Sequence, residues 1–338
     1  MNAFDYTRAA DLADAIRQKG ADPAARFIAG GTNLIDLIKY DVERPTRLID
    51  ISRLPLRSVE ETESGGVQIG ALVPNSDLAY DPTVTQRYPM LRSAILAGAS
   101  AQLRNMASVG GNLLQRTRCA YFYDVVTPCN KRAPGSGCSA VEGLNRMHAI
   151  LGTSPSCIAT HPSDMCVALL ALEAVVHVAG PGGERRIPIA DFHRLPGDTP
   201  ERDTNLDPRE IITAVELPAK GFPTHWTYLK LRDRLSYAFA LVAVAVGLEL
   251  ERGIIADARL ALGGVAHKPW RDPQAEAALC GQKPNGAAFA RAAELLLRTA
   301  RHSDHNGFKI DLTRRAIIRA LRQAAAGTPQ SQSHKKIA

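Results

Sequence analysis

Aromatic residues are scarce in this chain of 338 residues, and so are long runs of like charges or of apolar residues. Aromatics make up 5% of the sequence, and no run of five or more like charges appears although the net charge is +7. Nucleic-acid-binding surfaces rely on clustered basic charge and on rings that stack with bases, so this class is disfavoured. The scattered positive charge favours a solvated surface or a docking face for acidic partners.

Apolar runs are short as well. No stretch approaches the roughly 20 apolar residues that a membrane-spanning helix needs, and the first residues have no apolar signal core. We therefore expect no membrane insertion and find no export signal on this chain. The sequence is also without an internal repeat, a G-x-G-x-x-G nicotinamide fingerprint and a legible Ser/His/Asp or paired-carboxylate site. Structural roles are favoured for His148, His161 and His267 over acid–base or ligand roles.

Six cysteines in a chain of 338 residues are too few for the dense disulfide framework of a small secreted protein. Four of them are spaced C-x9-C-x8-C-x18-C, which matches neither a structural zinc site nor the compact bacterial ferredoxin run. These are Cys119, Cys129, Cys138 and Cys157. They lie in polar, turn-rich sequence that apolar packing does not explain, so this loop could supply four thiolates to a [4Fe–4S] cluster. Four unrelated reduced cysteines are the alternative, and Cys166 and Cys280 are predicted to be core residues.

Hydrophobic periodicity and turn residues predict an α+β fold in several parts. Residues 1–57 form a first lobe, with a helix over 11–20 that Asp11 caps and Gly20 ends, a strand at 26–29, a helix at 33–39 and a strand at 47–52. Residues 58–220 form a second lobe, with a loop at 73–77, a terminal strand at 211–218 and a cysteine-bearing insertion at 115–158. Residues 225–325 form a C-terminal α+β domain of strands (226–231, 237–250, 258–262) followed by helices (272–279, 287–300, 311–325). Residues 326–338 are predicted to be a disordered tail.

Two glycine-containing turns are the clearest candidate binding elements. Gly30-Gly31-Thr32-Asn33 lies between a strand and a helix, where free backbone N–H groups can bind a phosphate. Ser108-Val109-Gly110-Gly111-Asn112 is a turn of the same character in the second lobe, and two such turns could hold the two halves of one flavin dinucleotide. Each turn alone is also compatible with an ordinary tight turn.

Two charged residues could join such a site. Asp164 either binds a ribityl hydroxyl or caps the helix that follows it. Lys230 either lies near a flavin ring, where a cation stabilises the reduced state, or is simply solvated.

Five motifs that occur in order carry a resemblance to a known family. They are Ala29-Gly-Gly-Thr-Asn-Leu34, Ala107-Ser-Val-Gly-Gly-Asn-Leu113, Thr160-His-Pro-Ser-Asp164, Arg232-Asp-Arg-Leu-Ser-Tyr-Ala-Phe-Ala240 and Leu262-Gly-Gly-Val-Ala-His-Lys-Pro-Trp270. Together they resemble the FAD-binding medium subunits of the molybdenum hydroxylases, the xanthine dehydrogenase family, over residues 1–325. The cysteine insertion is most similar to that of flavin subunits from periplasmic aldehyde oxidoreductases, and more distantly to that of hydroxybenzoyl-CoA reductase.

The resemblance implies a two-lobed FAD-binding domain of the vanillyl-alcohol-oxidase (PCMH) type and a C-terminal α+β domain of the CO dehydrogenase flavoprotein type. It also implies which residues bind the cofactors. FAD would contact Phe27, Ile28, Ala29, Gly30, Gly31, Thr32, Asn33, Leu34, Ser108, Gly110, Gly111, Asn112, Asp164, Ile212 and Lys230. The [4Fe–4S] cluster would be bound by Cys119, Cys129, Cys138 and Cys157, and no further catalytic residue is expected on this chain.

The resemblance further implies partners and an activity. The chain would assemble into a heterotrimer with a large molybdenum-cofactor subunit and a small [2Fe–2S] subunit. An aldehyde would be oxidised on another chain, and electrons would reach an external acceptor through this FAD. The location would be cytoplasmic, or periplasmic through co-export with a partner that carries the signal.

Two other functions compete with this interpretation. A stand-alone FAD oxidase or dehydrogenase of the same fold would need an acid–base residue over the flavin, for which only Tyr237 stands out. A basic zinc module that binds nucleic acid would leave both glycine turns without a role.

Overall fold

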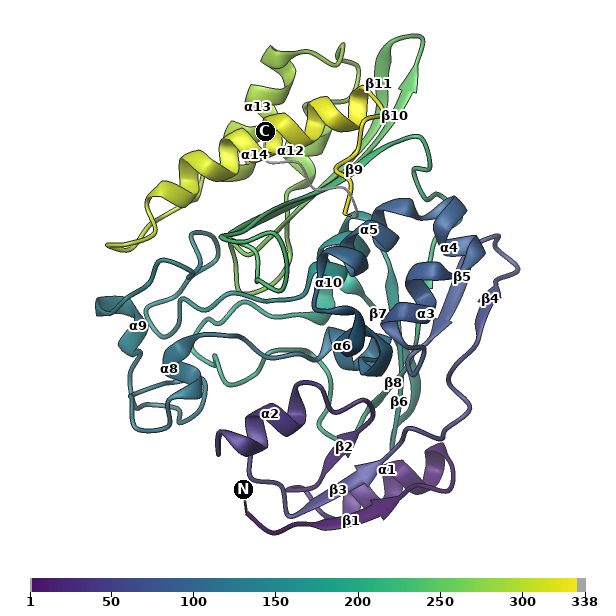
Figure 1. The fold of residues 1–338 in the computed structure, drawn as a ribbon, viewed down its shortest axis with the longest axis vertical. Helices are drawn as coiled ribbons and strands as arrows, with labels where there is room; N and C mark the ends of the chain where they lie inside the picture. The colour runs from purple at the N-terminus through teal and green to yellow at the C-terminus, as the bar shows by residue number, and fades with distance from the viewer. Residues whose placement is uncertain (1, 333–338) are drawn as a thin grey trace.

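The computed structural model describes residues 2–332 and arranges them around three β-sheets (Figure 1). Each sheet takes its strands from one of the three ranges that the sequence predicts to fold as a unit. The sheets contain three, five and four strands. The fold is thus mixed α and β, as expected.

The N-terminal sheet is parallel, in the order β1-β3-β2, with β1 (Asp5–Arg8), β2 (Arg26–Ile28) and β3 (Arg47–Asp50). Parallel neighbours require long connections, and helices α1 (Leu12–Ala21) and α2 (Leu34–Lys39) supply them. The Asp11 carboxylate accepts a 2.7 Å hydrogen bond from the Asp14 N–H and starts α1, as predicted. Gly20 does not end this helix, because it lies inside the last turn before Ala21.

The middle sheet is antiparallel, in the order β4-β5-β8-β6-β7. Its strands are β4 (Val59–Glu61), β5 (Val67–Gly70), β6 (Val175–Gly180), β7 (Gly183–Pro188) and β8 (Ile211–Leu217). The helices of this region are α3 (Asn75–Tyr80), α4 (Pro82–Arg87), α5 (Pro89–Ala97), α6 (Ala101–Met106), α7 (Val109–Leu113), α10 (Asp164–Ala171) and α11 (Ile189–Phe192). The loop predicted at 73–77 is wrong in its second half, because α3 begins at Asn75 directly after Pro74.

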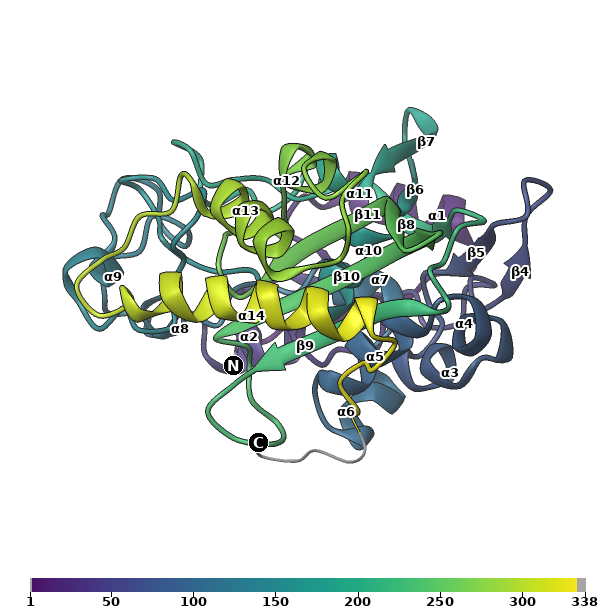
Figure 2. The same ribbon diagram turned by 90° about the horizontal axis from the view of Figure 1, so that it is seen from above.

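The C-terminal sheet is antiparallel, in the order β12-β11-β10-β9, and is covered on both faces. Its strands are β9 (His225–Leu231), β10 (Val242–Glu251), β11 (Ile254–Gly263) and β12 (Trp270–Arg271), and its helices are α12 (Pro273–Ala277), α13 (Gly286–Leu297) and α14 (Phe308–Ala325). Side chains alternate along a strand, so Val244 and Val246 of β10 pack against α13 and α14 while Ala243 and Ala245 join the core around α5 and α10. Figure 2 shows α13 and α14 lying over this sheet.

The cysteine-bearing insertion contains little regular structure. Two single-turn helices, α8 (Ala120–Tyr123) and α9 (Ser139–Glu142), lie to one side of the sheets (Figure 1). An isolated antiparallel bridge joins Cys129 to Cys138, and another joins Ser154 to Cys157. The loop is therefore held by local pairing between its own cysteine-bearing segments.

The end of the chain is only partly described. Residues 333–338 of the predicted disordered tail lie outside the described residues. Before them, the Gln330 side chain accepts a 2.9 Å hydrogen bond from the Lys230 N–H, and the Gln332 amide donates to the Tyr228 carbonyl at 3.2 Å. This part of the predicted tail thus lies along β9. Within residues 2–332, no helix is both long and apolar enough to cross a membrane.

Candidate functional site

A cavity of about 1120 Å³ lies where the three sheets meet. Its wall takes residues from the β2–α2 turn, from α7, from the start of α10, and from β8 and β9. All fifteen residues predicted to contact FAD line it: Phe27, Ile28, Ala29, Gly30, Gly31, Thr32, Asn33, Leu34, Ser108, Gly110, Gly111, Asn112, Asp164, Ile212 and Lys230. The chain thus brings together residues more than 200 positions apart in the sequence.

The first glycine turn offers free donors to this cavity. Within residues 2–332, no partner takes the backbone N–H groups of residues 30–33. Gly31 has a φ of 71°, which favours glycine. A Cβ on Gly30 would lie 1.8 Å from the Met106 carbonyl oxygen, so this turn can only pass α6 without a side chain. Unpaired N–H groups in a turn are suited to the pyrophosphate of a dinucleotide.

The second glycine turn is built differently, because the N–H groups of residues 109–112 already donate within the protein. Those of Val109 and Gly110 donate to the Val73 and Ala71 carbonyls at 3.0 and 2.8 Å, and that of Gly111 donates to the Ser108 hydroxyl at 3.3 Å. A Cβ on Gly110 would lie 3.1 Å from the Ala71 Cβ. This turn therefore shapes the cavity wall by close packing rather than by free N–H donors.

Asp164 and Lys230 form a buried ion pair in the cavity wall. The Lys230 Nζ lies 2.7 Å from the Asp164 Oδ2, with side-chain exposures of 2% and 9%, and also donates to the Ala97 carbonyl at 3.1 Å. The Tyr228 hydroxyl donates to the other Asp164 oxygen at 2.7 Å, and burial together with this carboxylate raises the pKa of Tyr228 well above its usual range. Lys230 is thus not a solvated lysine. The helix cap expected of Asp164 is supplied by Ser163, whose hydroxyl accepts from the Cys166 N–H at 3.0 Å.

Buried polar atoms without partners indicate that the cavity fits a polar ligand. Asn75 is 3% exposed and lines the cavity, yet its Oδ1 has no hydrogen-bond partner in the part of the chain that the structure describes. The Nε2 of His161, another residue that lines the cavity, also has no hydrogen-bond partner among the described residues. Such atoms are costly unless a ligand or water satisfies them. The residues present therefore fit a dinucleotide with polar groups along its length.

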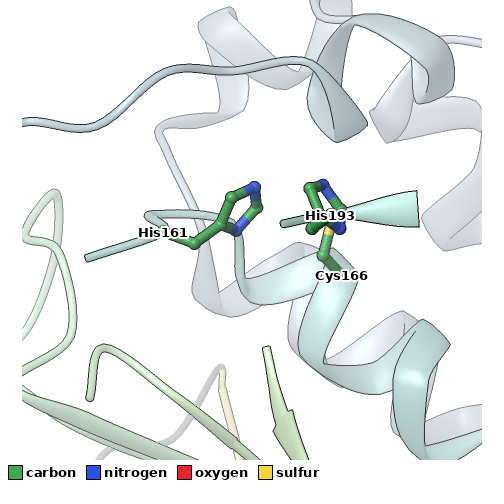
Figure 3. A group of neighbouring side chains, drawn as sticks. All are labelled: His161, Cys166 and His193. Carbon is green, nitrogen blue, oxygen red and sulfur yellow. The ribbon is translucent and has the colours of Figure 1, made fainter. Parts of the chain in front are cut away.

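His161, Cys166 and His193 form a buried group beside this cavity (Figure 3). Their ligand atoms lie within 4.8 Å of one another. His193 Nε2 lies 2.9 Å from the Leu113 carbonyl and so donates to it, while His161 Nδ1 accepts from the Ser163 N–H at 3.3 Å. Burial lowers the pKa of His161 well below its usual value and that of His193 to about 4, so both rings are neutral at pH 7. The group ties the end of α7 to the turn before α10, and Cys166, with 0% exposure, takes the core position predicted for it.

The four cysteines of the insertion converge on a second, smaller cavity. Cys119, Cys129, Cys138 and Cys157 all line it, and all four are free of disulfides. Burial raises the pKa of the Cys119 thiol to about 12 and that of Cys157 to about 11. A buried thiol with a raised pKa keeps its proton at pH 7 and becomes a thiolate only when a metal centre binds and displaces that proton.

The geometry of a zinc site limits how far apart its sulfur ligands can lie. Zinc–sulfur bonds of about 2.3 Å in a tetrahedral site bring the sulfur atoms to about 3.8 Å from one another. Among residues 2–332, the group of side chains that meets within 4.8 Å is the histidine–cysteine group above, and the four cysteines form no such group. Four free cysteines that line one cavity are a set of side chains that can hold a metal centre.

A buried charge network joins the insertion to the rest of the molecule. The Lys131 Nζ, between the second and third cysteines, lies beside the Asp203 carboxylate and donates to the Pro200 carbonyl at 2.7 Å. The Arg116 guanidinium bridges Asp203 at 2.9 Å and Glu43 at 2.8 Å. These cations hold the pKa of Asp203 well below its usual range despite its burial. The loop at 195–205 is thus fixed against Arg116 and Lys131 of the cysteine-bearing insertion.

Comparison with known proteins identifies the family. The profile described as "FAD binding domain in molybdopterin dehydrogenase" matches residues 2–220, and "CO dehydrogenase flavoprotein C-terminal domain" matches residues 226–324. The chain belongs to the FAD-binding medium subunits of the molybdenum hydroxylases. The resemblance stated from the sequence motifs is confirmed.

Several relatives cover this medium subunit almost end to end. The aldehyde oxidoreductase FAD-binding subunit PaoB of Escherichia coli (strain K12) is 50% identical over 327 residues, which are 96% of this chain and 99% of that protein. The glyceraldehyde dehydrogenase medium chain of Sulfolobus acidocaldarius is 29% identical, over 95% and 96% of the two chains. Among solved structures, carbon monoxide dehydrogenase from Hydrogenophaga pseudoflava matches with a TM-score of 0.76 and 26% identity, over 96% and 98% of the chains. Quinoline 2-oxidoreductase from Pseudomonas putida 86 matches with a TM-score of 0.74 and 25% identity, over 97% and 98%.

Sequence reasoning missed several residues of this medium subunit's site. Asn75 stood in the predicted loop at 73–77, and nothing in that pattern marked its side chain as buried. His193 and Asp203 lie far along the chain from the residues that they contact, so no local spacing could have revealed them. Tyr237, the acid–base candidate of the competing flavoenzyme, is 56% exposed and lines the cavity.

Proposed function

We propose that this chain is the FAD- and [4Fe–4S]-containing electron-transfer subunit of a molybdenum-cofactor aldehyde oxidoreductase. The observation that carries the proposal is the pairing of two cavities in one subunit. One is lined by all fifteen predicted FAD contacts, and the other by four free cysteines. The 50% identity to a relative named as an aldehyde oxidoreductase FAD-binding subunit supports the substrate class.

The residues of the larger cavity would hold FAD in defined parts. The free N–H groups of residues 30–33 would bind the pyrophosphate, and the packed turn at 108–112 would support the cofactor from the other side. Asp164 would accept hydrogen bonds from ribityl hydroxyls, and the Lys230 Nζ, 2.7 Å from its Oδ2, would hold the carboxylate in place. FAD when bound supplies a carrier that accepts two electrons and releases them singly or in pairs.

The cysteine residues would hold a [4Fe–4S] cluster at the smaller cavity. Lys131 lies between Cys129 and Cys138 in the sequence. Its positive charge lowers the pKa of the Cys157 thiol and so counteracts part of the rise that burial causes. The bound cluster supplies one-electron chemistry whose potential depends on charge and hydrogen bonding around its sulfurs. The aldehyde would be oxidised on another subunit of the complex.

The assembly we propose is a heterotrimer. The partners are a large subunit with the molybdenum cofactor and a small subunit with [2Fe–2S] clusters, and an external acceptor takes the electrons from this chain. The complex would work in the periplasm after export with a partner that carries the signal, or in the cytoplasm.

The decisive test is an ultraviolet–visible spectrum with iron and acid-labile sulfide analysis on the anaerobically purified chain. We expect flavin bands, a broad iron–sulfur shoulder and about four irons per chain. Cys129→Ser should lose the shoulder and the iron. Cys280→Ser should keep both, because Cys280 lies in the turn after α12 and its sulfur contacts the Glu276 carbonyl instead of lining the smaller cavity.

Other outcomes separate the parts of the proposal. Flavin without iron would remove the cluster and favour a stand-alone flavoenzyme, which steady aldehyde turnover by the isolated chain would confirm. Zinc in place of iron would remove the electron-transfer role of the insertion. A well-folded chain that binds neither FAD nor iron would overturn the whole proposal.

A further inference from the structure

Cys119 lies in the wall that separates the two cavities. It lines the smaller cavity together with the other three cysteines, and it also lines the larger cavity. His148 lines the larger cavity as well, and its Nε2 lies 3.1 Å from the Cys119 sulfur. Cys119, the predicted cluster ligand that also borders the larger cavity, therefore has the His148 imidazole in contact with its sulfur.

The direction of this hydrogen bond follows from the chemistry of a ligated sulfur. A thiolate bound to iron carries no proton and can only accept, so the imidazole has to donate from Nε2. His148 is 6% exposed, and its Nδ1 has no partner among the described residues, so nothing competes for the ring. Hydrogen bonds to cluster sulfurs stabilise the extra negative charge of the reduced state and raise the reduction potential.

The C-terminal domain fixes the position of this histidine. The Nζ of Lys309, a residue with 0% exposure, donates to the His148 carbonyl at 2.8 Å and to the Gly264 carbonyl at 2.6 Å. The Asn306 side chain donates to the Ala149 carbonyl at 3.1 Å. A fully buried lysine that donates to main-chain carbonyls restrains the backbone on which His148 stands.

We propose that His148 is a positioning residue that donates a hydrogen bond to the Cys119 sulfur and thereby raises the reduction potential of the cluster. The hydrogen bond would lie at the ligand that borders the larger cavity, where FAD is proposed to bind. This inference rests on the proposed function, because it requires the cluster to be present. It assigns a role to a histidine for which the sequence favoured a purely structural one.

The test compares His148→Phe with His302→Phe in the anaerobically purified chain. Phenylalanine keeps a ring of similar size and removes the donor, and His302 is an exposed histidine whose Nδ1 lies 3.1 Å from the Ser303 carbonyl. We measure iron per chain and then the midpoint potential, by redox titration followed with electron paramagnetic resonance. We expect His148→Phe to retain iron with a more negative midpoint potential and His302→Phe to match the wild type. His148→Gln, which keeps an N–H donor, should restore part of the shift.

A measurement on the wild-type protein covers the case in which His148→Phe fails to fold. With ¹⁵N-labelled histidine, pulsed electron paramagnetic resonance of the reduced cluster should detect a histidine nitrogen coupled to it. A cluster with no such coupling, or an unchanged potential in an iron-loaded His148→Phe, would overturn the inference while leaving the proposed function intact. A wild-type chain without iron would instead overturn the cluster itself.

Discussion

Gly30 lies where the turn after β2 passes the end of α6, and that contact leaves no room for a side chain. In Gly30→Ala the new Cβ would meet the Met106 carbonyl at 1.8 Å, so the turn or α6 must shift. We expect a loss of about 1–3 kcal/mol in the free energy of unfolding, typical of overpacking, and loss of bound FAD because the free N–H groups move. Urea unfolding and the ratio of flavin to protein measure the two effects.

Gly20 is the matched control for that substitution. It lies in α1 with nothing within 4 Å of an added Cβ, so Gly20→Ala should stabilise the protein by about 0.5–1 kcal/mol through the unfolded chain. Its flavin content should equal that of the wild type. If Gly30→Ala behaved like Gly20→Ala, the close packing of the first turn would not matter for binding.

At the scale of elements, α7 and the turn before α10 are joined through buried neutral histidines. The pKa of His193 falls from about 6.5 in the unfolded chain to about 4 in the folded protein, because burial disfavours its charged form. The unfolded chain thus binds one more proton between these values. The contribution of His193 to stability is complete above pH 6.5 and is lost as the pH falls toward 4, at about 1.4 kcal/mol per pH unit.

His193→Gln should therefore flatten the pH dependence of the unfolding free energy. Glutamine can still donate to the Leu113 carbonyl but has no proton to take up. Between pH 6 and 5 we expect the slope to decrease by about 1.4 kcal/mol per pH unit, measured by urea unfolding. The exposed His302→Gln should leave the slope unchanged. Equal slopes for wild type and His193→Gln would show that this ring takes up protons in the folded state as readily as in the unfolded chain.

Elements with a clear period could be predicted from the sequence, and elements decided by distant contacts could not. The helix started by Asp11 and the strand β8 were predicted because capping and alternation are local signals. The strand predicted from Tyr237 begins only at Val242, because the residues before it border the large cavity instead of joining the sheet. The four cysteines could be named as a set, but their convergence depends on contacts such as Lys131–Asp203 that span 72 positions.

At the scale of the molecule, the large cavity draws on all three sheets. Ile28 belongs to the first, Ile212 to the second and Lys230 to the third. The second and third sheets also share one apolar core, in which Tyr228 and Ala245 pack with residues of α5 and α10. This shared core itself joins the second and third sheets by apolar packing, apart from the cavity.

This arrangement predicts how FAD changes unfolding of the chain. Because the shared core couples the sheets, calorimetry of the FAD-free chain should show one cooperative transition rather than separate ones for residues 2–220 and 226–324. Added FAD should move that transition to higher temperature without splitting it, with about 2.7 kcal/mol gained at a ligand concentration 100-fold above Kd. Two transitions that merge only when FAD is bound would mean that the cofactor, and not the apolar core, joins the domains. Riboflavin, which has no pyrophosphate for the free N–H groups of residues 30–33, should raise the transition temperature far less at the same concentration.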